Sequence, residues 1–228
     1  MQSQTKCPTI KPEIVIFESN ISGREFLAMH KWCAITGTPF RLSKDGRGFD
    51  INKNLFIGTT DFIESVLGLH FEPDYYPPWA SVLVSRRIKK TIRVPGRECF
   101  VKPADKYKTF TGFVKEKGKL IKECLADEYW ISDIVSFQQE WRYYVAKGNI
   151  LETGWYQGED EEEPAPKLEI DIPQDVYGAL DIGRLSNGNL ELVEFHHPYS
   201  IGWYGRNDNA YAEFLIKGWE NLLTLLTD

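Results

Sequence analysis

The sequence predicts a mixed fold of the α/β or α+β class, with most of its strands in the second half of the chain. Short apolar runs bounded by Gly, Pro, Asn or Ser recur along the chain, as expected for buried strands. Other segments carry apolar residues at three- and four-residue spacing, which predicts amphipathic helices. Of the 228 residues, 42% are hydrophobic and 14% aromatic, which suffices for a substantial core and excludes a disordered or fibrous protein.

The first third of the chain is predicted to alternate strands and helices. Strands are expected at residues 14–17, 39–42 and 55–58. Ser22 and Glu25 resemble a capping box, and apolar residues at helical spacing follow as far as Gly37, so a helix is expected between the first two strands. Thr59 and the two residues after it can cap a second helix that ends at Leu67.

Three prolines among aromatic residues at 68–81 are typical of a connection, and we place a boundary between two lobes there. A basic helical segment is expected at 82–92. Further strands are expected at residues 99–103, 111–114, 130–137, 141–145, 150–152, 179–182 and 190–195. The Ser-Asn-Gly-Asn sequence at 186–189 predicts that the last two form a hairpin. Apolar residues at helical spacing predict a C-terminal helix at 211–226.

The charge balance argues against a general nucleic-acid-binding protein. The 27 basic and 33 acidic residues give a formal net charge of −6, so no overall positive field attracts phosphate backbones. The N-terminus lacks the apolar stretch of a secretory signal, and no segment reaches the roughly 20 apolar residues that span a bilayer. We therefore expect a cytoplasmic protein without nucleic-acid or membrane partners.

The four cysteines lie far apart, without the spacing or the nearby histidines of a zinc site or the pattern of a disulfide framework. We interpret them as ordinary thiols. Cys33 and Cys99 lie in apolar runs and are expected in the core.

Lys102 stands at the end of an apolar strand that Pro103 stops. Its ammonium can project beyond the core and meet phosphate as a point charge. The loop that follows contains Thr109, Thr111 and Gly112, whose hydroxyls and backbone N–H groups can fold over phosphate oxygens. The alternative is a strand-end lysine that simply reaches solvent, and no P-loop sequence occurs.

Two carboxylates interrupt the apolar strands of the predicted hairpin. Asp181 and Glu194 each lie between two apolar residues. A carboxylate in such surroundings needs a partner or a metal, and carboxylates on adjacent strands suit Mg²⁺. His196, two residues after Glu194, shares its strand face and can join the site. The periodicity is equally consistent with carboxylates that face solvent.

Glu140 and Arg142 share one face of the strand Glu-Trp-Arg-Tyr-Tyr-Val. The arginine can hold a carboxylate or a phosphate through two hydrogen bonds, and the glutamate can accept bonds from ribose hydroxyls. A surface ion pair is the alternative. Arg86 and Arg87 belong to a basic cluster, which is usually a solvated helix face.

Taken in order from about Ser85 to Tyr204, these motifs resemble the ATP-grasp family. The order is a basic segment, the Val-Lys-Pro strand with its Thr/Gly loop, a hinge strand, the strand of Arg142, and a Leu-Asp-Ile-Gly hairpin that continues into Val-Glu-Phe-His. Residues 179–184 and 200–205 resemble a short clade of that family, marked by arginines and a lysine and found in phages and bacterial conflict systems.

The resemblance implies an α+β fold that holds ATP between two lobes. It implies an N-terminal α/β pre-ATP-grasp domain at residues 1–80, a small lobe at 81–137, and a large lobe at 138–228 that carries the metal-binding hairpin and the C-terminal helix.

The resemblance also implies roles for the polar residues. Lys102 resembles the lysine that contacts the α- and β-phosphates, and Arg142 an arginine turned toward the γ-phosphate or an acyl phosphate. Asp181 and Glu194 match the metal ligands. His196 occupies the position of the usual asparagine, and because an imidazole is a softer ligand than an amide oxygen, Mn²⁺ is an alternative to Mg²⁺.

The nucleotide contacts implied in this way are Arg87, Lys102, Thr109, Thr111, Gly112, Asp133, Ile134, Val135 and Glu140. Residues 130–135 resemble the hinge whose backbone reads adenine, with Asp133 where many relatives have a glutamate. Glu140 stands where an acidic residue commonly meets the ribose. Arg87 or Arg86 is the nearest match to the first phosphate-binding lysine of the fold.

The activity implied is an ATP-dependent carboxylate–amine ligase that works through an acyl phosphate and releases ADP and phosphate. Lys102 and Arg142 are the expected catalytic residues, and small-molecule or peptide carboxylates and amines are the expected partners. The sequence sets neither the substrates nor the oligomeric state. One alternative is a non-catalytic nucleotide-binding module, if His196 prevents productive metal geometry. Another is a metal-dependent nuclease using Asp181, Glu194 and His196, which the acidic net charge disfavours.

Overall fold

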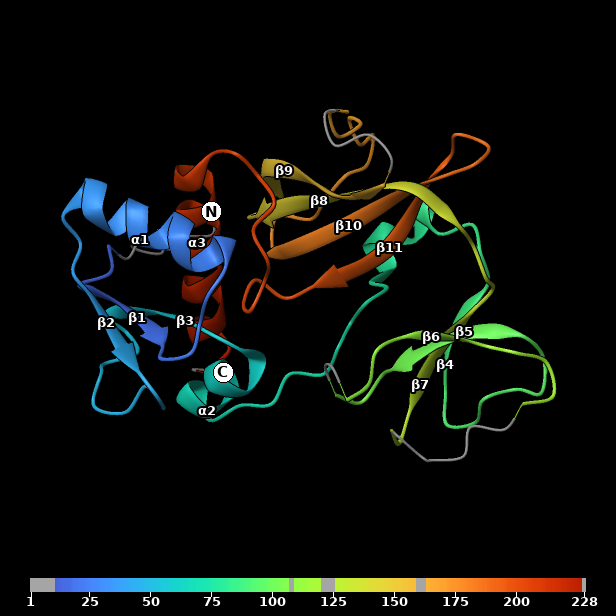
Figure 1. The fold of residues 1–228 in the computed structure, drawn as a ribbon, viewed down its shortest axis with the longest axis horizontal. Helices are drawn as coiled ribbons and strands as arrows, with labels where there is room; N and C mark the ends of the chain where they lie inside the picture. The colour runs from blue at the N-terminus through green and yellow to red at the C-terminus, as the bar shows by residue number, and fades with distance from the viewer. Residues whose placement is uncertain (1–10, 107–108, 120–125, 159–162, 227–228) are drawn as a thin grey trace, which may run out of the picture.

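The computed structural model describes residues 11–106, 109–119, 126–158 and 163–226. In this part of the chain three β-sheets follow one another along the molecule, and helices cover the first of them (Figure 1). One sheet is parallel and two are antiparallel, so the fold is α+β, as the family resemblance implied. Among these residues, no helix has the length and apolar character that a membrane span requires.

The first sheet is parallel and has the strand order β2 (Phe40–Ser43), β1 (Ile14–Glu18), β3 (Asn54–Ile57). Its helices are α1 (Arg24–Thr36) and α2 (Thr60–Leu67). Gly37 ends α1 in the left-handed region with φ of 70°, as a C-cap glycine does. Thr59 caps α2 by accepting the backbone N–H of Phe62. Both helices therefore lie where the sequence predicts them.

The capping box predicted at Ser22 and Glu25 is wrong. Gly23 is the N-cap of α1, and no side chain caps this helix end. Glu25 instead accepts the backbone N–H of Trp203, at 3.0 Å. A long-range contact has therefore replaced the local one. Cys33 and Cys99 are buried and free, as predicted.

The second sheet is small and has the order β4 (Ile88–Thr91), β7 (Tyr129–Ser132), β5 (Cys99–Pro103), β6 (Phe113–Lys115). The helix predicted at 82–92 is wrong, because a short 3₁₀ helix, η1 (Pro78–Leu83), leads into β4. Ile88 and Thr91 are β-branched and favour a strand. Lys89 and Lys90 are exposed on this edge strand, where lysines discourage pairing with another chain.

The third sheet has the order β11 (Leu190–His196), β10 (Gly178–Leu185), β8 (Phe137–Ala146), β9 (Asn149–Gly158). The hairpin of β10 and β11 is confirmed. Alternation along β8 separates the two faces of the sheet. Trp141, Tyr143 and Val145 pack in one core, and Tyr144 packs in another with the N-terminal domain. Arg142 shares the face of Tyr144.

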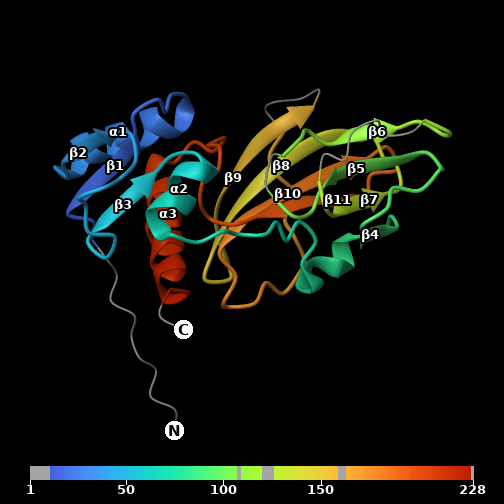
Figure 2. The same cartoon turned by 90° about the horizontal axis from the view of Figure 1, so that it is seen from below.

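The C-terminal helix α3 (Asp208–Thr224) lies between the first and third sheets (Figure 2). Phe214 contacts Tyr144 of β8, with ring centroids 5.3 Å apart. Trp219 contacts Phe56 of β3 at 5.2 Å. The helix that we expected to belong to the large lobe therefore also packs into the core of the N-terminal sheet.

A buried ion pair holds the segment before β4 against β11. Arg86 Nη1 lies 2.7 Å from Glu191 Oε1 and donates to the carbonyl of Leu192 at 2.6 Å. The backbone N–H of Ser85 donates to the same carboxylate, at 3.0 Å from Oε2. The two charged side chains are only 6% and 1% exposed. Loss of either charge would leave the other buried without its counter-ion.

Glu191→Gln should lower the free energy of unfolding by about 3–5 kcal/mol, the range for breaking a buried pair by removing one partner. The matched control is Glu213→Gln, which removes the exposed partner of Lys217 and should cost about 0–1 kcal/mol. Urea unfolding measures both. Equal losses in the two variants would show that the Arg86 pair does not hold the segment in place.

Candidate functional site

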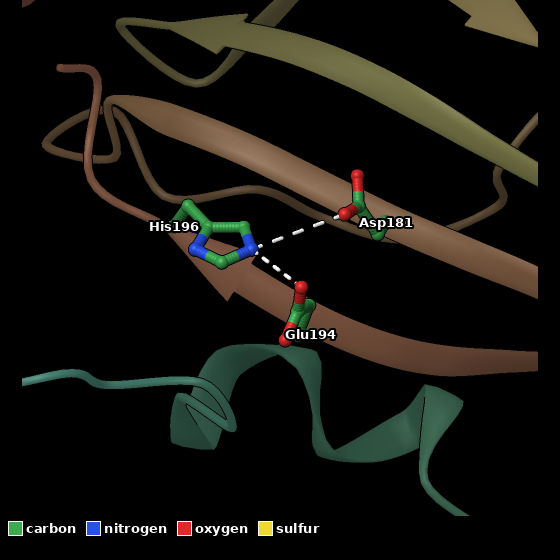
Figure 3. A group of neighbouring side chains, drawn as sticks. All are labelled: Asp181, Glu194 and His196. Atoms are coloured by element: carbon green, nitrogen blue, oxygen red, sulfur yellow. Dashed lines mark hydrogen bonds and ion pairs between the residues drawn. The ribbon is translucent and has the colours of Figure 1, made fainter. Parts of the chain in front are cut away.

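The hairpin brings the three predicted metal ligands together. Asp181 pairs with Glu194 across the ladder, and the register then shifts so that Ile182 pairs with Leu192. Figure 3 shows Asp181, Glu194 and His196 on one side of the sheet. His196 Nε2 lies 2.6 Å from Glu194 Oε1 and 4.0 Å from Asp181 Oδ2. One ligand atom from each residue lies within 4.8 Å of the other two.

Arg142 forms a two-bond ion pair with Asp181. Its Nε lies 2.7 Å from Asp181 Oδ1, and its Nη2 lies 2.6 Å from Oδ2. Both side chains are buried, at 7% and 1% exposed. Burial favours the neutral form of Arg142, but Asp181 raises the pKa of the guanidinium above its ordinary value. The arginine expected near phosphate therefore pairs with a carboxylate that we expect to bind the metal.

Lys102 reaches this cluster from the second sheet. Its ammonium forms an ion pair with Glu194 and lies 3.4 Å from the centre of the Tyr75 ring. We expected the ammonium to project from the strand end, but its side chain is only 8% exposed. Burial would raise the pKa of Glu194, but the charges of His196 and Lys102 hold it well below its ordinary value. The ion pair also ties the second sheet to the third.

Glu140 adds a further acidic group on the face of Arg142. The pKa of Glu140 is raised to about 7, chiefly by burial and also by the negative charges of Asp181 and Glu194, while the charge of Arg142 opposes the rise. The carboxyl is therefore partly protonated at neutral pH.

A cavity of about 370 Å³ opens beside the cluster, between the third sheet and the N-terminal domain. It is lined by Glu25, Thr60, Arg142, Tyr156, Glu194, His196, His197, Tyr199, Ser200, Ile201, Gly202 and Tyr204. The volume falls in the range of small-molecule sites, roughly 300–1,000 Å³. A ligand in this cavity would touch Arg142 and two of the three side chains of Figure 3, Glu194 and His196.

Arg87 and Asp133 form a separate exposed ion pair. Arg87 Nε lies 2.8 Å from Asp133 Oδ2, and Arg97 Nη1 lies 3.1 Å from Oδ1. The hydrogen bond from Arg87 lowers the pKa of Asp133. Arg86, the other match to the first phosphate-binding lysine, is buried against Glu191 instead.

The remaining predicted nucleotide contacts lie in the loops of the second sheet. Ile134 and Val135 follow β7, and Ile134 is 43% exposed. Thr109 and Thr111 are exposed between β5 and β6. Gly112 lies against the ring of Phe100, where a Cβ would come within 2.5 Å of the ring. These residues are on the lobe that carries Lys102, and their part in binding stays a prediction.

Sequence reasoning missed the aromatic rings around the two cations. Lys102 lies over Tyr75 and, at 5.1 Å, over Tyr76. The Arg142 guanidinium carbon lies 5.1 Å from the ring centre of Tyr156 and 5.3 Å from that of Tyr204. The many aromatic residues in the sequence indicated that cation–π contacts were available. Which ring meets which cation depends on tertiary contacts that the sequence does not display.

The chemistry of the cluster fits a divalent cation. Asp181 and Glu194 supply the hard oxygen ligands that Mg²⁺ prefers. The Nε2 of His196 is a nitrogen ligand, which Mn²⁺ accepts more readily than Mg²⁺. Both carboxylates already pair with cations, Glu194 with Lys102 and Asp181 with Arg142, so a metal at this position would have to share or displace these partners.

The three sheets, with Lys102 of the second meeting Glu194 of the third, have the arrangement of the ATP-grasp fold. The chain belongs to family 2 of the arginine- and lysine-marked clade of ATP-grasp domains, whose model matches residues 81–214, more than half of the chain. A comparison with curated proteins gave no match.

Two solved structures resemble the whole fold. The crystal structure of the D-cycloserine synthetase DcsG is 11% identical, with a TM-score of 0.58 over 90% of this chain and 99% of that one. A RimK domain ATP-grasp protein from Sphaerobacter thermophilus is 10% identical, with a TM-score of 0.53 over 93% of this chain and 99% of that one. At these identities the likeness establishes the fold alone.

Glu140→Gln should stabilise the protein at pH 8 and change little at pH 5. The pKa of Glu140 is about 7 in the folded protein, above its ordinary value of 4.5, so its contribution to stability is complete below 4.5 and is lost as the pH rises through 7. Glutamine resembles the protonated form and should avoid a loss on the order of 1–3 kcal/mol. Urea unfolding at both pH values measures this, with the exposed Glu213→Gln as control. A difference between Glu140→Gln and wild type that does not change with pH would contradict the raised pKa.

Proposed function

We propose that the protein is an ATP-dependent ligase that joins a carboxylate to an amine through an acyl phosphate and releases ADP and phosphate. The observation that carries the proposal is the convergence of two cations from different sheets, Lys102 and Arg142, on the carboxylates of one hairpin. Cations in that position can hold the phosphates of a nucleotide bound between the lobes. The synthetase name of DcsG supports this class of activity and leaves the substrate open.

The polar side chains take separate roles in this proposal. Lys102 exchanges Glu194 for oxygens of the α- and β-phosphates, and Arg142 faces the phosphoryl group that is transferred. Asp181, Glu194 and His196 hold a divalent cation, which when bound neutralises phosphate charge. The nucleotide site is completed by Glu140 at the ribose, the hinge residues Asp133, Ile134 and Val135 at the base, and Arg87, Thr109, Thr111 and Gly112 around the phosphates.

The proposed reaction has two steps. A carboxylate oxygen of the substrate attacks the γ-phosphorus, the bond to the bridging oxygen breaks, and ADP leaves. An amine nitrogen then attacks the acyl carbon, phosphate leaves, and the proton of the amine passes to the phosphate. Arg142 stabilises the charge that spreads over the transferred oxygens. The cavity beside Arg142 has room for a small molecule or the end of a peptide.

A second candidate is a module that binds the nucleotide without turning it over. The observation that favours it is His196, whose Nε2 already occupies one oxygen of Glu194 at 2.6 Å. Both candidates require nucleotide binding, and only the ligase releases ADP. Incubation of the wild-type protein with ATP, Mg²⁺ or Mn²⁺, and pools of carboxylates and amines therefore separates them by the ADP formed.

Asp181→Asn and Glu194→Gln should each reduce ADP release at least 100-fold with saturating ATP and metal. Each change removes an anionic oxygen that a hard cation requires. The exposed Glu213→Gln serves as the control and should keep wild-type turnover. Wild-type turnover in either site variant would remove that carboxylate from the metal site.

His196→Asn should keep or increase Mg²⁺-supported turnover, because it restores an oxygen ligand, whereas His196→Ala should weaken Mn²⁺ binding about tenfold. Mn²⁺ affinity is measured by electron paramagnetic resonance in the presence of a non-hydrolysable ATP analogue. His197→Asn is the control for metal affinity, because His197 stacks on Tyr199 with ring centroids 5.9 Å apart. Equal Mn²⁺ affinities for wild type and His196→Ala would leave the metal to Asp181 and Glu194.

A further inference from the structure

The ligands expected to hold the metal are already paired with the cations expected to hold the nucleotide. Glu194 bonds Lys102 through one oxygen and His196 through the other. Asp181 bonds Arg142 through both oxygens. A divalent cation entering this cluster alone would meet carboxylates whose oxygens are occupied and whose charges are neutralised.

We propose that Lys102 is a built-in counter-cation that keeps the divalent metal out of the site until a nucleotide draws its ammonium away from Glu194. Metal and nucleotide then bind as a coupled pair, each weakly alone and tightly together. The inference rests on the proposed function for the identities of the nucleotide and the metal, and it adds how their binding is controlled.

Lys102 suits this role better than Arg142 does. The Arg142 pair has two bonds, lies between adjacent strands of one sheet, and is almost wholly buried. The Lys102 ammonium, carried on a flexible stem from the other sheet, has one carboxylate partner among the described residues. Glu194 is also the more accessible carboxylate, at 25% exposed against 1% for Asp181. A phosphate can therefore compete for Lys102 without dismantling the sheet.

Electrostatic repulsion between Lys102 and the metal predicts that nucleotide and metal strengthen each other's binding. The ammonium contacts Glu194, so a metal bound to that carboxylate would lie within a few ångströms of a like charge in a partly buried site, where repulsion is weakly screened. Nucleotide phosphates remove this repulsion by attracting Lys102, and they supply further oxygen ligands for the metal. By linkage, the factor by which nucleotide strengthens metal binding equals the factor by which metal strengthens nucleotide binding.

The test measures Mn²⁺ binding by electron paramagnetic resonance, with and without a non-hydrolysable ATP analogue. In wild type the analogue should strengthen Mn²⁺ binding at least tenfold. Lys102→Met should bind Mn²⁺ alone at least tenfold more tightly than wild type, and the analogue should then add less than threefold. Lys102→Arg keeps the charge and should behave as wild type does. Lys115→Met is the matched control, because Lys115 is equally buried in the same sheet and, among the described residues, bonds the backbone carbonyls of Arg97 and Glu116.

Unchanged Mn²⁺ affinity in folded Lys102→Met, checked by circular dichroism, would overturn the inference. If that variant does not fold, the wild-type measurement tests the inference by itself. Equal Mn²⁺ affinities of wild type with and without the analogue would also overturn it. A different result would contradict the proposed function. If the protein binds Mn²⁺ and the analogue cooperatively but releases no ADP, it is not a ligase, and the coupling of metal and nucleotide binding still holds.

Discussion

The buried pair of Arg142 and Asp181 is the interaction on which the surrounding structure depends. A charge pair taken out of water is tolerated only with good geometry and further polar partners. The carbonyl of Gly202 supplies one, at 3.5 Å from Arg142 Nη1, and it also accepts the hydroxyl of Tyr144 at 2.6 Å. That hydroxyl in turn accepts the backbone N–H of Tyr204 at 2.8 Å. These bonds hold the segment before α3 against the third sheet.

The position of that segment sets the shape of the cavity and the place of the last helix. A Cβ at Gly154 would come within 2.3 Å of the Tyr204 backbone, so β9 needs a glycine where the segment crosses it. Beyond the crossing, the segment leads into α3, which shares a core with the N-terminal sheet. Glu25 accepts the N–H of Trp203 in the same segment. The first sheet and its helices are therefore joined to the third sheet through this segment, which bonds to Arg142 and Tyr144 hold in place.

The sequence predicted the elements of this site better than its contacts. Period-two alternation places Glu194 and His196 on one face, and the hairpin turn brings Asp181 opposite, so the proximity of these three side chains followed from local rules. The ion pair of Lys102 with Glu194 joins residues 92 positions apart in the chain, and no local pattern encodes which cation meets which carboxylate. The helix expected at 82–92 failed for a related reason, because a lysine-rich edge strand and a solvated helix face have similar composition.

Among the described residues, two ion pairs join the second sheet and the segment before it to the third sheet, and a nucleotide could replace one of them more easily than the other. Arg86 bonds Glu191 and two backbone carbonyls of β11, and both charged side chains are almost wholly buried, so a phosphate would have to break several buried bonds to take their place. Lys102 has one carboxylate, whose place an anionic phosphate can take. Both pairs end on β11, at Glu191 and at Glu194, three residues apart along one strand. Exchange of the Lys102 partner therefore leaves the lobe attached through Arg86, and binding can rearrange the site while the fold keeps its register.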